Sequence, residues 1–199
     1  MELFEWQGKR TEILDKLKPK HVTITPDEYL EAVEITCKRQ ATYAVARVRD
    51  KRLTAFAAHL YGTLGEYAAA QTREGAVVST VVCHGHGDTE VADVTLPDGR
   101  GVEVKSTRFG GSGVNMIIEP GKFLLERLHC LVIVNTSLID QCLVYPMIEG
   151  ESFREHHEMR DFGYGLKMAL RAEQIVLIAA NERMEARYGP CPAFSSLWA

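Results

Sequence analysis

Three ionisable residues in one short segment of this 199-residue chain could do chemistry together: Asp93, Glu103 and Lys105. Carboxylate oxygens are the ligands that hard divalent cations prefer. A fixed ammonium group next to them would stabilise negative charge that develops during a reaction. The sequence therefore has the parts of a metal site with a catalytic cation, provided that the local fold brings them together.

The residues between the two acids predict a β-hairpin. In the segment 96–100, Pro97 fixes the φ angle that a type I turn needs, and Gly99 supplies the left-handed residue of a three-residue loop. Residue 96 then faces residue 100, so Asp93 lies directly opposite Glu103, with Cβ atoms about 5 Å apart. Lys105 shares their face. The alternating valines at 94, 102 and 104 occupy the other face.

The same register selects among the acids of the hairpin. Asp88 has the opposite parity to Asp93, and Asp98 belongs to the turn. Two carboxylates in cross-strand contact repel, so Asp93 and Glu103 need a shared proton, a cation or a metal such as Mg²⁺ or Mn²⁺. The alternative is an ordinary exposed strand, in which Glu103 and Lys105 are solvated and Asp93 lies opposite by chance.

Composition narrows the class of protein. The formal net charge of −4 argues against indiscriminate binding to nucleic acid but leaves room for a local basic groove. No apolar run approaches the ~20 residues of a membrane span and the start lacks a signal-peptide pattern, so we expect a cytoplasmic protein without a membrane partner. The five cysteines are odd in number and widely separated, which favours reduced thiols. The sequence has no phosphate-binding loop, dinucleotide fingerprint or serine-hydrolase elbow.

Helices are predicted on both sides of a set of strands. Thr25-Pro26-Asp27-Glu28 is a strong helix start. The predicted helices cover residues 25–49, 53–73, 122–129, 150–159 and 166–173, and the predicted strands cover 76–83, 89–107, 114–118, 130–135 and 141–148. A crossover helix at 122–129 between strands favours an α/β fold with a mixed sheet covered on both faces. We expect a single domain over 1–199, with a helical N-terminal extension at 1–52, a core at 53–148 and a helical or irregular C-terminal extension at 149–199.

The helix before the strands carries a second feature. In Gly62-Thr-Leu-Gly65-Glu66, followed by three alanines, small residues make one helical surface thin enough to approach the sheet closely. Glu66 could then reach the face of Asp93 and Glu103. The alternative is an exposed glutamate on an alanine-rich helix, because glutamate is a good helix former.

Together these elements resemble the PD-(D/E)xK nuclease superfamily over residues 53–148. The resemblance consists of a helix with Gly-x-x-Gly-Glu, a strand, a hairpin with Asp93 on one arm and Glu103-x-Lys105 on the other, then a helix and two strands. It implies a restriction-endonuclease-like core in which Asp93, Glu103 and the Val104 carbonyl bind Mg²⁺ (or Mn²⁺). Lys105 would orient the attacking water and stabilise the phosphorane, and Glu66 would be an additional ligand. Ala92 stands where the family name has proline.

The resemblance implies a Mg²⁺-dependent DNA endonuclease of the restriction, repair or junction-resolving kind. Ser106, Thr107 and Arg108 would hold neighbouring phosphates, although the two hydroxyl residues could equally well only end the strand. One alternative is a nuclease-fold protein that binds DNA or assembles with a partner without turnover, and another is an RNA nuclease. A homodimer would allow both DNA strands to be cut.

Overall fold

The computed structural model describes residues 3–42, 55–80, 91–108, 114–163 and 165–189. In chain order these residues form the elements α1 (Leu3–Lys16), β1 (Lys20–Thr23), α2 (Pro26–Thr42), α3 (Ala55–Gln71), β2 (Val77–Val78), β3 (Val94–Thr95), β4 (Gly101–Arg108), β5 (Asn115–Ile118), the 3₁₀ turn η1 (Pro120–Lys122), β6 (Leu128–Val134), β7 (Gln141–Val144), β8 (Ile148–Glu149), α4 (Gly150–His156), β9 (Glu158–Asp161), β10 (Leu166–Arg171) and α5 (Ala172–Tyr188).

The main sheet is mixed. Its strand order is β1-β7-β6-β4-β3-β2, and β8 also pairs with β6. Strands β4 and β6 are parallel, whereas the other pairs are antiparallel. A second sheet has the order β5-β10-β9. The predicted α/β class with a mixed sheet flanked by helices is therefore confirmed.

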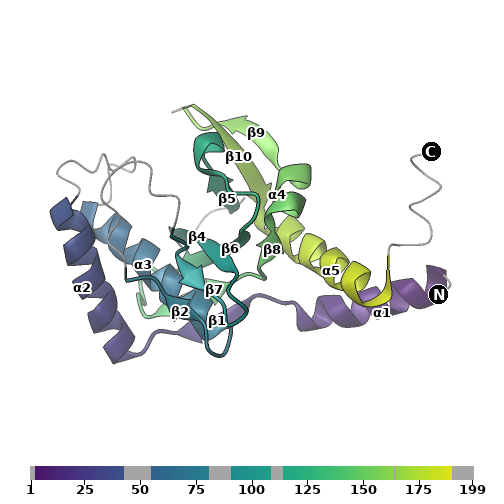
Figure 1. The fold of residues 1–199 in the computed structure, drawn as a ribbon, viewed down its shortest axis with the longest axis horizontal. Coiled ribbons are helices and arrows are strands. Elements are labelled where there is room, and N and C mark those ends of the chain that lie inside the picture. Colours follow the sequence, from purple (N-terminus) through teal and green to yellow (C-terminus); the bar gives the residue numbers. More distant parts are fainter. Residues whose placement is uncertain (1–2, 43–54, 81–90, 109–113, 164, 190–199) are drawn as a thin grey trace.

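Each face of the main sheet packs against a different set of elements. Buried residues of β4 and β6 such as Val104 and Val132 pack with Leu64 and Ala68 of α3 in one core. Leu131 of β6 points to the opposite face and packs with Phe153 of α4 and Ile175 of α5 in a second core. Figure 1 shows α2 beside α3 at one end of the molecule, and α1 beside α5 at the other.

The hairpin has the predicted register. Val94 pairs with Val102, which places Asp93 opposite Glu103. The amide of Leu96 donates to the carbonyl of Arg100 at 2.9 Å, and Gly99 has the left-handed φ of 85° that the turn requires. The strand pairing of β3 is short, however, because it stops at Val94, so Asp93 lies just beyond the paired residues.

The start of α2 is also as predicted. The amide and hydroxyl of Thr25 donate to the Glu28 carboxylate, both at 2.8 Å, and the Glu28 amide donates back to the Thr25 hydroxyl at 3.3 Å. This reciprocal pair satisfies main-chain donors that the first turn of a helix leaves without partners. It fixes where α2 begins, and therefore which of its side chains face α3.

The thin surface of α3 is used for close packing against β4. A Cβ atom added at Gly65 would lie 1.9 Å from Ser106 Oγ and 3.1 Å from Ser106 Cβ. The Ser106 hydroxyl donates to the Gly62 carbonyl at 3.4 Å, whereas a Cβ at Gly62 itself would meet no atom within 4 Å. Of these two glycines, only Gly65 is therefore required for the approach of helix and strand.

This difference predicts opposite effects for two similar substitutions. Gly65→Ala should lower the free energy of unfolding by about 1 kcal/mol, because Ser106 must rotate and β4 must shift. Gly62→Ala should raise it by about 0.5–1 kcal/mol, because alanine is the better helix former and has room. Denaturant unfolding measures both values. Equal effects of the two substitutions would show that α3 does not approach β4 at Gly65.

Two of the predicted helices are wrong. Residues 122–129 form no crossover helix: η1 ends at Lys122, and β6 begins at Leu128 as a strand whose seven residues are all buried. A short, fully buried run has no polar face, so its periodicity does not separate a strand from a helix. Residues 166–171 form β10 rather than a helix, and the helix that follows is α5.

Other boundaries differ less. The predicted helix 150–159 ends at His156, where α4 gives way to β9. Strand β1 was not predicted, and it pairs with β7 at the edge of the main sheet. The segment before residue 53 thus contributes an edge strand as well as helices. The predicted strand 76–83 contains β2, and its last residues lie outside the described part of the chain.

The cysteines and the membrane prediction can be compared with the described residues. Cys37, Cys130 and Cys142 are free thiols; the last two are buried and Cys37 is exposed. Cys83 and Cys191 lie outside the described residues. Within the described ranges, no helix combines the length and apolar character needed to cross a bilayer.

Candidate metal and catalytic site

Asp93 is the central residue of the predicted site. Its Oδ2 atom accepts a hydrogen bond from the Val104 amide at 2.7 Å. Burial, together with the negative charges of Glu66 and Glu103, raises the pKa of Asp93 to about 7. Lys105 and the Val104 amide act in the opposite direction. Asp93 therefore lies within electrostatic reach of all three other predicted site residues.

The main-chain amide and carbonyl of Val104 point toward the edge of β4 at which Asp93 lies. Hydrogen-bonded and non-hydrogen-bonded pairs alternate along an antiparallel ladder. The Leu96–Arg100 bond of the turn fixes the phase of this alternation, so the amide and the carbonyl of Val104 both point toward the β3 side. The amide meets Asp93 there. The predicted carbonyl ligand thus faces the edge where Asp93 lies.

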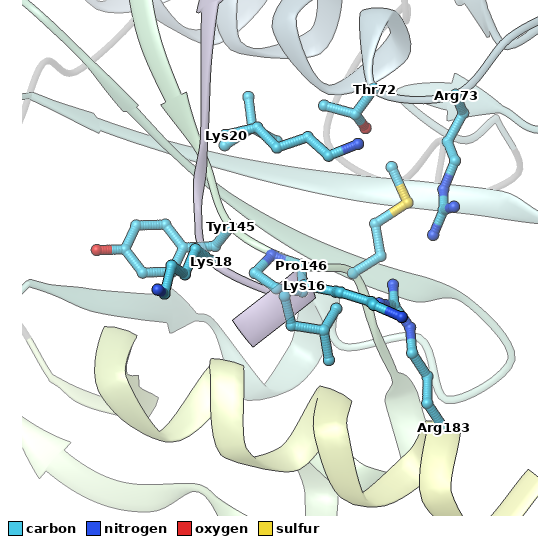
Figure 2. A pocket seen from close by; sticks show the side chains of 11 residues that line it. Lys16, Lys18, Lys20, Thr72, Arg73, Tyr145, Pro146 and Arg183 are labelled. Atoms are coloured by element: carbon cyan, nitrogen blue, oxygen red, sulfur yellow. The ribbon is translucent and has the colours of Figure 1, made fainter. Parts of the chain in front are cut away.

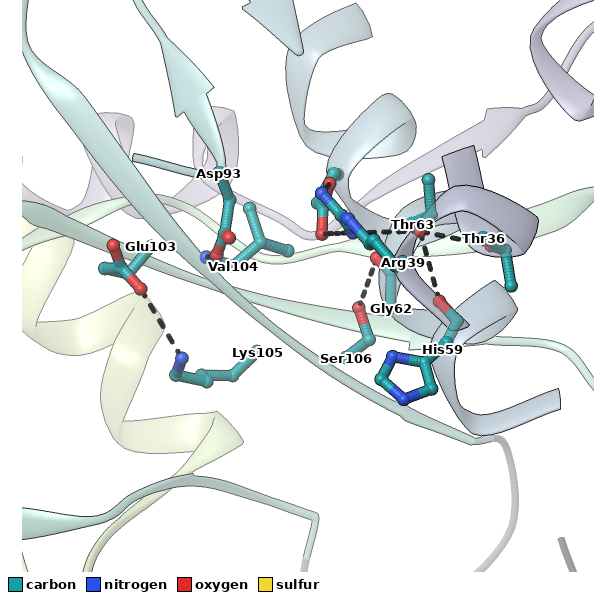
Figure 3. Close-up of polar contacts among 11 residues, drawn as sticks. Thr36, Arg39, His59, Gly62, Thr63, Asp93, Glu103, Val104, Lys105 and Ser106 are labelled. Atoms are coloured by element: carbon teal, nitrogen blue, oxygen red, sulfur yellow. Dashed lines mark hydrogen bonds and ion pairs between the residues drawn. The ribbon is translucent and has the colours of Figure 1, made fainter. Parts of the chain in front are cut away.

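Glu103 is held by two cations on the face of β4 away from α3. Arg127 forms a close ion pair with its Oε1 atom, and Lys105 Nζ lies 3.6 Å from Oε2. Arg127 is itself buried and also donates to the Val91 carbonyl at 3.1 Å. Figure 3 shows Lys105 extending toward Glu103 along β4. The predicted pairing of Glu103 with Lys105 on one face is therefore observed.

Glu66 is buried on α3 and is paired with Arg39 of α2. The guanidinium of Arg39 donates to both carboxylate oxygens, at 2.8 and 2.9 Å, and also to the Thr63 hydroxyl at 3.0 Å. Thr36 donates to Thr63 at 3.4 Å (Figure 3). The alternative of an exposed glutamate is thus wrong. Since Val104 packs beneath α3, Glu66 and Glu103 lie on opposite sides of β4, and Asp93 lies at the edge between them.

Among the described residues, the cluster brings together three acids, Asp93, Glu66 and Glu103, and three cations, Arg39, Arg127 and Lys105. In this arrangement, no group of three or more potential ligands among the described residues is placed to hold a metal ion. The donors nevertheless fit a hard cation, because carboxylates and a carbonyl are all oxygen ligands. The raised pKa of Asp93 also indicates that the nearby cations do not offset its burial and the charges of the other two acids.

The predicted phosphate-contacting residues do not share one face. Ser106 points toward α3, where its hydroxyl contacts the Gly62 carbonyl. Thr107 has the parity of Lys105 and lies on the other face, and Arg108 ends the strand. Of the three, only Thr107 lies on the side of Glu103 and Lys105. The Ser106 hydroxyl is occupied in helix packing.

His129 lies next to Glu103 on β6 but does not offset its charge. The ring is fully buried and stacks on Phe123 at a centroid distance of 5.2 Å. Burial lowers the pKa of His129 to about 4, so the ring is neutral at pH 7. Its Nε2 atom is 3.1 Å from the Leu124 carbonyl. Arg127 and Lys105 thus remain the cations that hold Glu103.

Arg39 and Arg127 are the two members of the cluster that sequence reasoning missed. Arg39 follows Lys38 in a basic pair that is typical of solvated surface, and Arg127 lies in the segment wrongly predicted to be helical. The spacing of Thr36 and Arg39 on one helical face was the available signal for Arg39. No local pattern marks Arg127, because its partner Glu103 lies 24 residues earlier, on β4.

Neither models of protein families nor curated proteins gave a match to this sequence. Any function assigned to the chain therefore has to be supported by its sequence and by the geometry of its described residues.

The Arg39–Glu66 pair gives a prediction for stability. Arg39→Met should lower the free energy of unfolding at pH 8 by about 3 kcal/mol, because it leaves the buried Glu66 carboxylate beside Asp93 without its partner. Chemical denaturation measures the change. The neighbouring Lys38→Met is the control, since Lys38 and its partner Glu34 are both exposed, and it should change stability by less than about 0.5 kcal/mol.

A second variant separates charge from packing in this test. If the loss comes from the unpaired carboxylate, the double variant with Arg39→Met and Glu66→Gln should recover much of the stability. A double variant no more stable than Arg39→Met alone would contradict the electrostatic explanation.

Proposed function

We propose that this protein is a metal-dependent nuclease that hydrolyses phosphodiester bonds of DNA, with a restriction-endonuclease-like core. The observation that carries the proposal is the position of Asp93. It lies opposite Glu103 at the end of β3, beside the Val104 main chain and within electrostatic reach of Lys105. A structural carboxylate gains nothing from a site that raises its pKa to about 7, whereas perturbed acids are common at functional sites.

In this proposal Asp93, Glu103 and the Val104 carbonyl hold Mg²⁺ or Mn²⁺. The bound ion would acidify a water and neutralise non-bridging phosphate oxygens. Lys105 contributes a fixed positive charge on the Glu103 face, where it stabilises negative charge that grows on the phosphate. Glu66 acts through Asp93, because its charge raises the pKa of Asp93 while Arg39 holds it on the other side of β4.

A second candidate is a nuclease-fold protein that binds DNA or a partner without cutting. It is favoured by the close ion pairs of Arg39 with Glu66 and of Arg127 with Glu103, which give two of the acids a partner without a metal. Under this alternative Arg127 is the permanent partner of Glu103. Under the nuclease proposal, Glu103 keeps its Oε2 atom for the metal while Arg127 holds Oε1.

The two candidates differ in a cleavage assay. Purified protein is incubated with supercoiled, linear, branched and single-stranded DNA and with an RNA of matched sequence, each with Mg²⁺, Mn²⁺ or EDTA. We expect cleavage of a DNA substrate that needs the metal and is lost in Glu103→Ala and Lys105→Ala. Binding without cleavage under every metal would favour the second candidate, and cleavage of RNA alone would replace DNA as the substrate.

A further inference from the structure

A basic pocket lies at the C-terminal end of α3. It has a volume of about 250 Å³, and four segments that are distant in the sequence line it. Five of the lining residues are cations: Lys16 at the end of α1, Lys18 in the link after it, Lys20 at the start of β1, Arg73 after α3, and Arg183 of α5. None of the described residues that line it is acidic. In a chain of net charge −4, this is a local excess of positive charge.

Arg73, Arg183 and Lys16 extend toward one space, whereas Lys18 extends away from it, beside Tyr145 (Figure 2). In Figure 2 the guanidinium groups of Arg73 and Arg183 point toward each other, and the ammonium of Lys16 extends toward Arg183. Buried apolar side chains, Leu17 and Met147, belong to the same lining. Lys18 is partly offset by Asp15 at 3.4 Å. The pocket therefore combines apolar lining residues with several cationic hydrogen-bond donors, which is a lining that suits an anion.

The positive charges of Arg73 and Arg183 repel each other. The pKa of Arg183 is lowered, mainly by burial and also by the positive charge of Arg73, while Glu182 acts in the opposite direction. Folding alone gives no reason to gather two guanidinium groups and an ammonium around one cavity. Guanidinium groups bind phosphate oxygens in pairs, and lysine adds a compact charge.

We propose that this pocket binds neighbouring phosphate groups of a small or terminal phosphate ligand, such as a nucleoside diphosphate or triphosphate. The volume is below the ~300–1,000 Å³ of typical sites for drug-sized ligands, which suits phosphate groups better than a whole nucleotide. The open rim of exposed lysines and arginines leaves the rest of the ligand in solvent. None of the three acids of the candidate catalytic site lines this pocket, so the proposal does not depend on nuclease activity.

Calorimetric titration of the full chain in low salt, without divalent metal, tests the pocket. The probes are inorganic pyrophosphate, ATP and a 5′-phosphorylated oligonucleotide with its unphosphorylated match. The variants are Arg73→Gln and Arg183→Gln. The control is Arg187→Gln, which removes the same charge from an exposed position one turn further along α5, outside the lining.

We expect saturable binding of at least one probe, weakened at least tenfold in Arg73→Gln and Arg183→Gln and less than twofold in Arg187→Gln. Binding of pyrophosphate and ATP identifies a free phosphate ligand, and binding only of the 5′-phosphorylated oligonucleotide identifies a strand end. A thermal melt checks folding: the pocket variants should melt no lower than the wild type, because each substitution removes repulsion between Arg73 and Arg183. No saturable binding, or equal weakening in all three variants, would overturn the proposal.

Discussion

Asp93→Asn is expected to stabilise the metal-free protein at pH 8 while it abolishes metal-dependent cleavage. Burial and the charges of Glu66 and Glu103 raise the pKa of Asp93 to about 7, so at pH 8 folding has to place an ionised carboxylate in an unfavourable environment. The neutral amide removes that cost but is a weaker acceptor for the Val104 amide. The net gain should be about 2 kcal/mol, or roughly 4–8 °C in Tm.

The pH dependence of the stability gained in Asp93→Asn follows from the direction in which the pKa of Asp93 is shifted. An aspartate ionises near pH 4 in the unfolded chain and near pH 7 in the folded one. Protonated Asp93 therefore favours the folded state, and this contribution to stability is complete below pH 4. It is lost as the pH rises from about 4 to 7. Melting curves should show Asp93→Asn and wild type converging near pH 4, separating between about pH 4 and pH 7, and staying apart by a constant amount above pH 7.

Asp98→Asn is the matched control in the same hairpin. Asp98 is exposed in the turn, and hydrogen bonds from the Arg100 amide and side chain lower its pKa. Its substitution should slightly lower stability at pH 8 and leave cleavage unchanged. An Asp93→Asn protein that is less stable than wild type at pH 8, or that still cleaves at the wild-type rate, would contradict the assigned environment and role.

Lys105→Met is expected to lower the cleavage rate by about 10²- to 10³-fold with little change in stability. The side chain is partly exposed, and its ion pair with Glu103 is long at 3.6 Å, so the fold depends little on it. In other enzymes, loss of one group that stabilises charge developing in the transition state lowers the rate by a factor of this size. Single-turnover cleavage at saturating protein measures the chemical step.

The pH profile separates this role from a structural one. Lys105 lowers the pKa of Asp93, so its removal should move the acidic limb of the cleavage profile to higher pH. Lys122→Met, which removes an exposed lysine that pairs with Glu119 at 3.4 Å, should leave both rate and profile unchanged. A full rate in Lys105→Met would remove Lys105 from the proposed mechanism.

The hairpin register was predictable because its determinants are local. Pro97 and Gly99 set the turn, and the alternating valines of β4 set which face is buried. This was enough to place Asp93 opposite Glu103 and Lys105 beside it. The close approach of α3 to β4 was predictable for the same reason, because it depends on one small residue of the helix, Gly65, against one strand.

The ion pairs of the site were not predictable, because they join distant segments. Arg39 reaches Glu66 from another helix, and Arg127 reaches Glu103 from the residue before β6. The wrong crossover helix has a related cause. β6 is buried on both faces between β4 and β7, so its sequence lacks the polar alternation that marks an edge or half-exposed strand.

Nicking of a supercoiled plasmid tests the central claim most directly. Wild-type protein and Glu103→Gln, purified by the same procedure, are compared in Mg²⁺ and in EDTA. We expect wild type to convert the plasmid in Mg²⁺ alone, with Glu103→Gln at least about 10²-fold slower at equal folding. Equal conversion by both proteins, or wild-type conversion in EDTA, would contradict a metal-dependent site built on Asp93, Glu103 and Lys105.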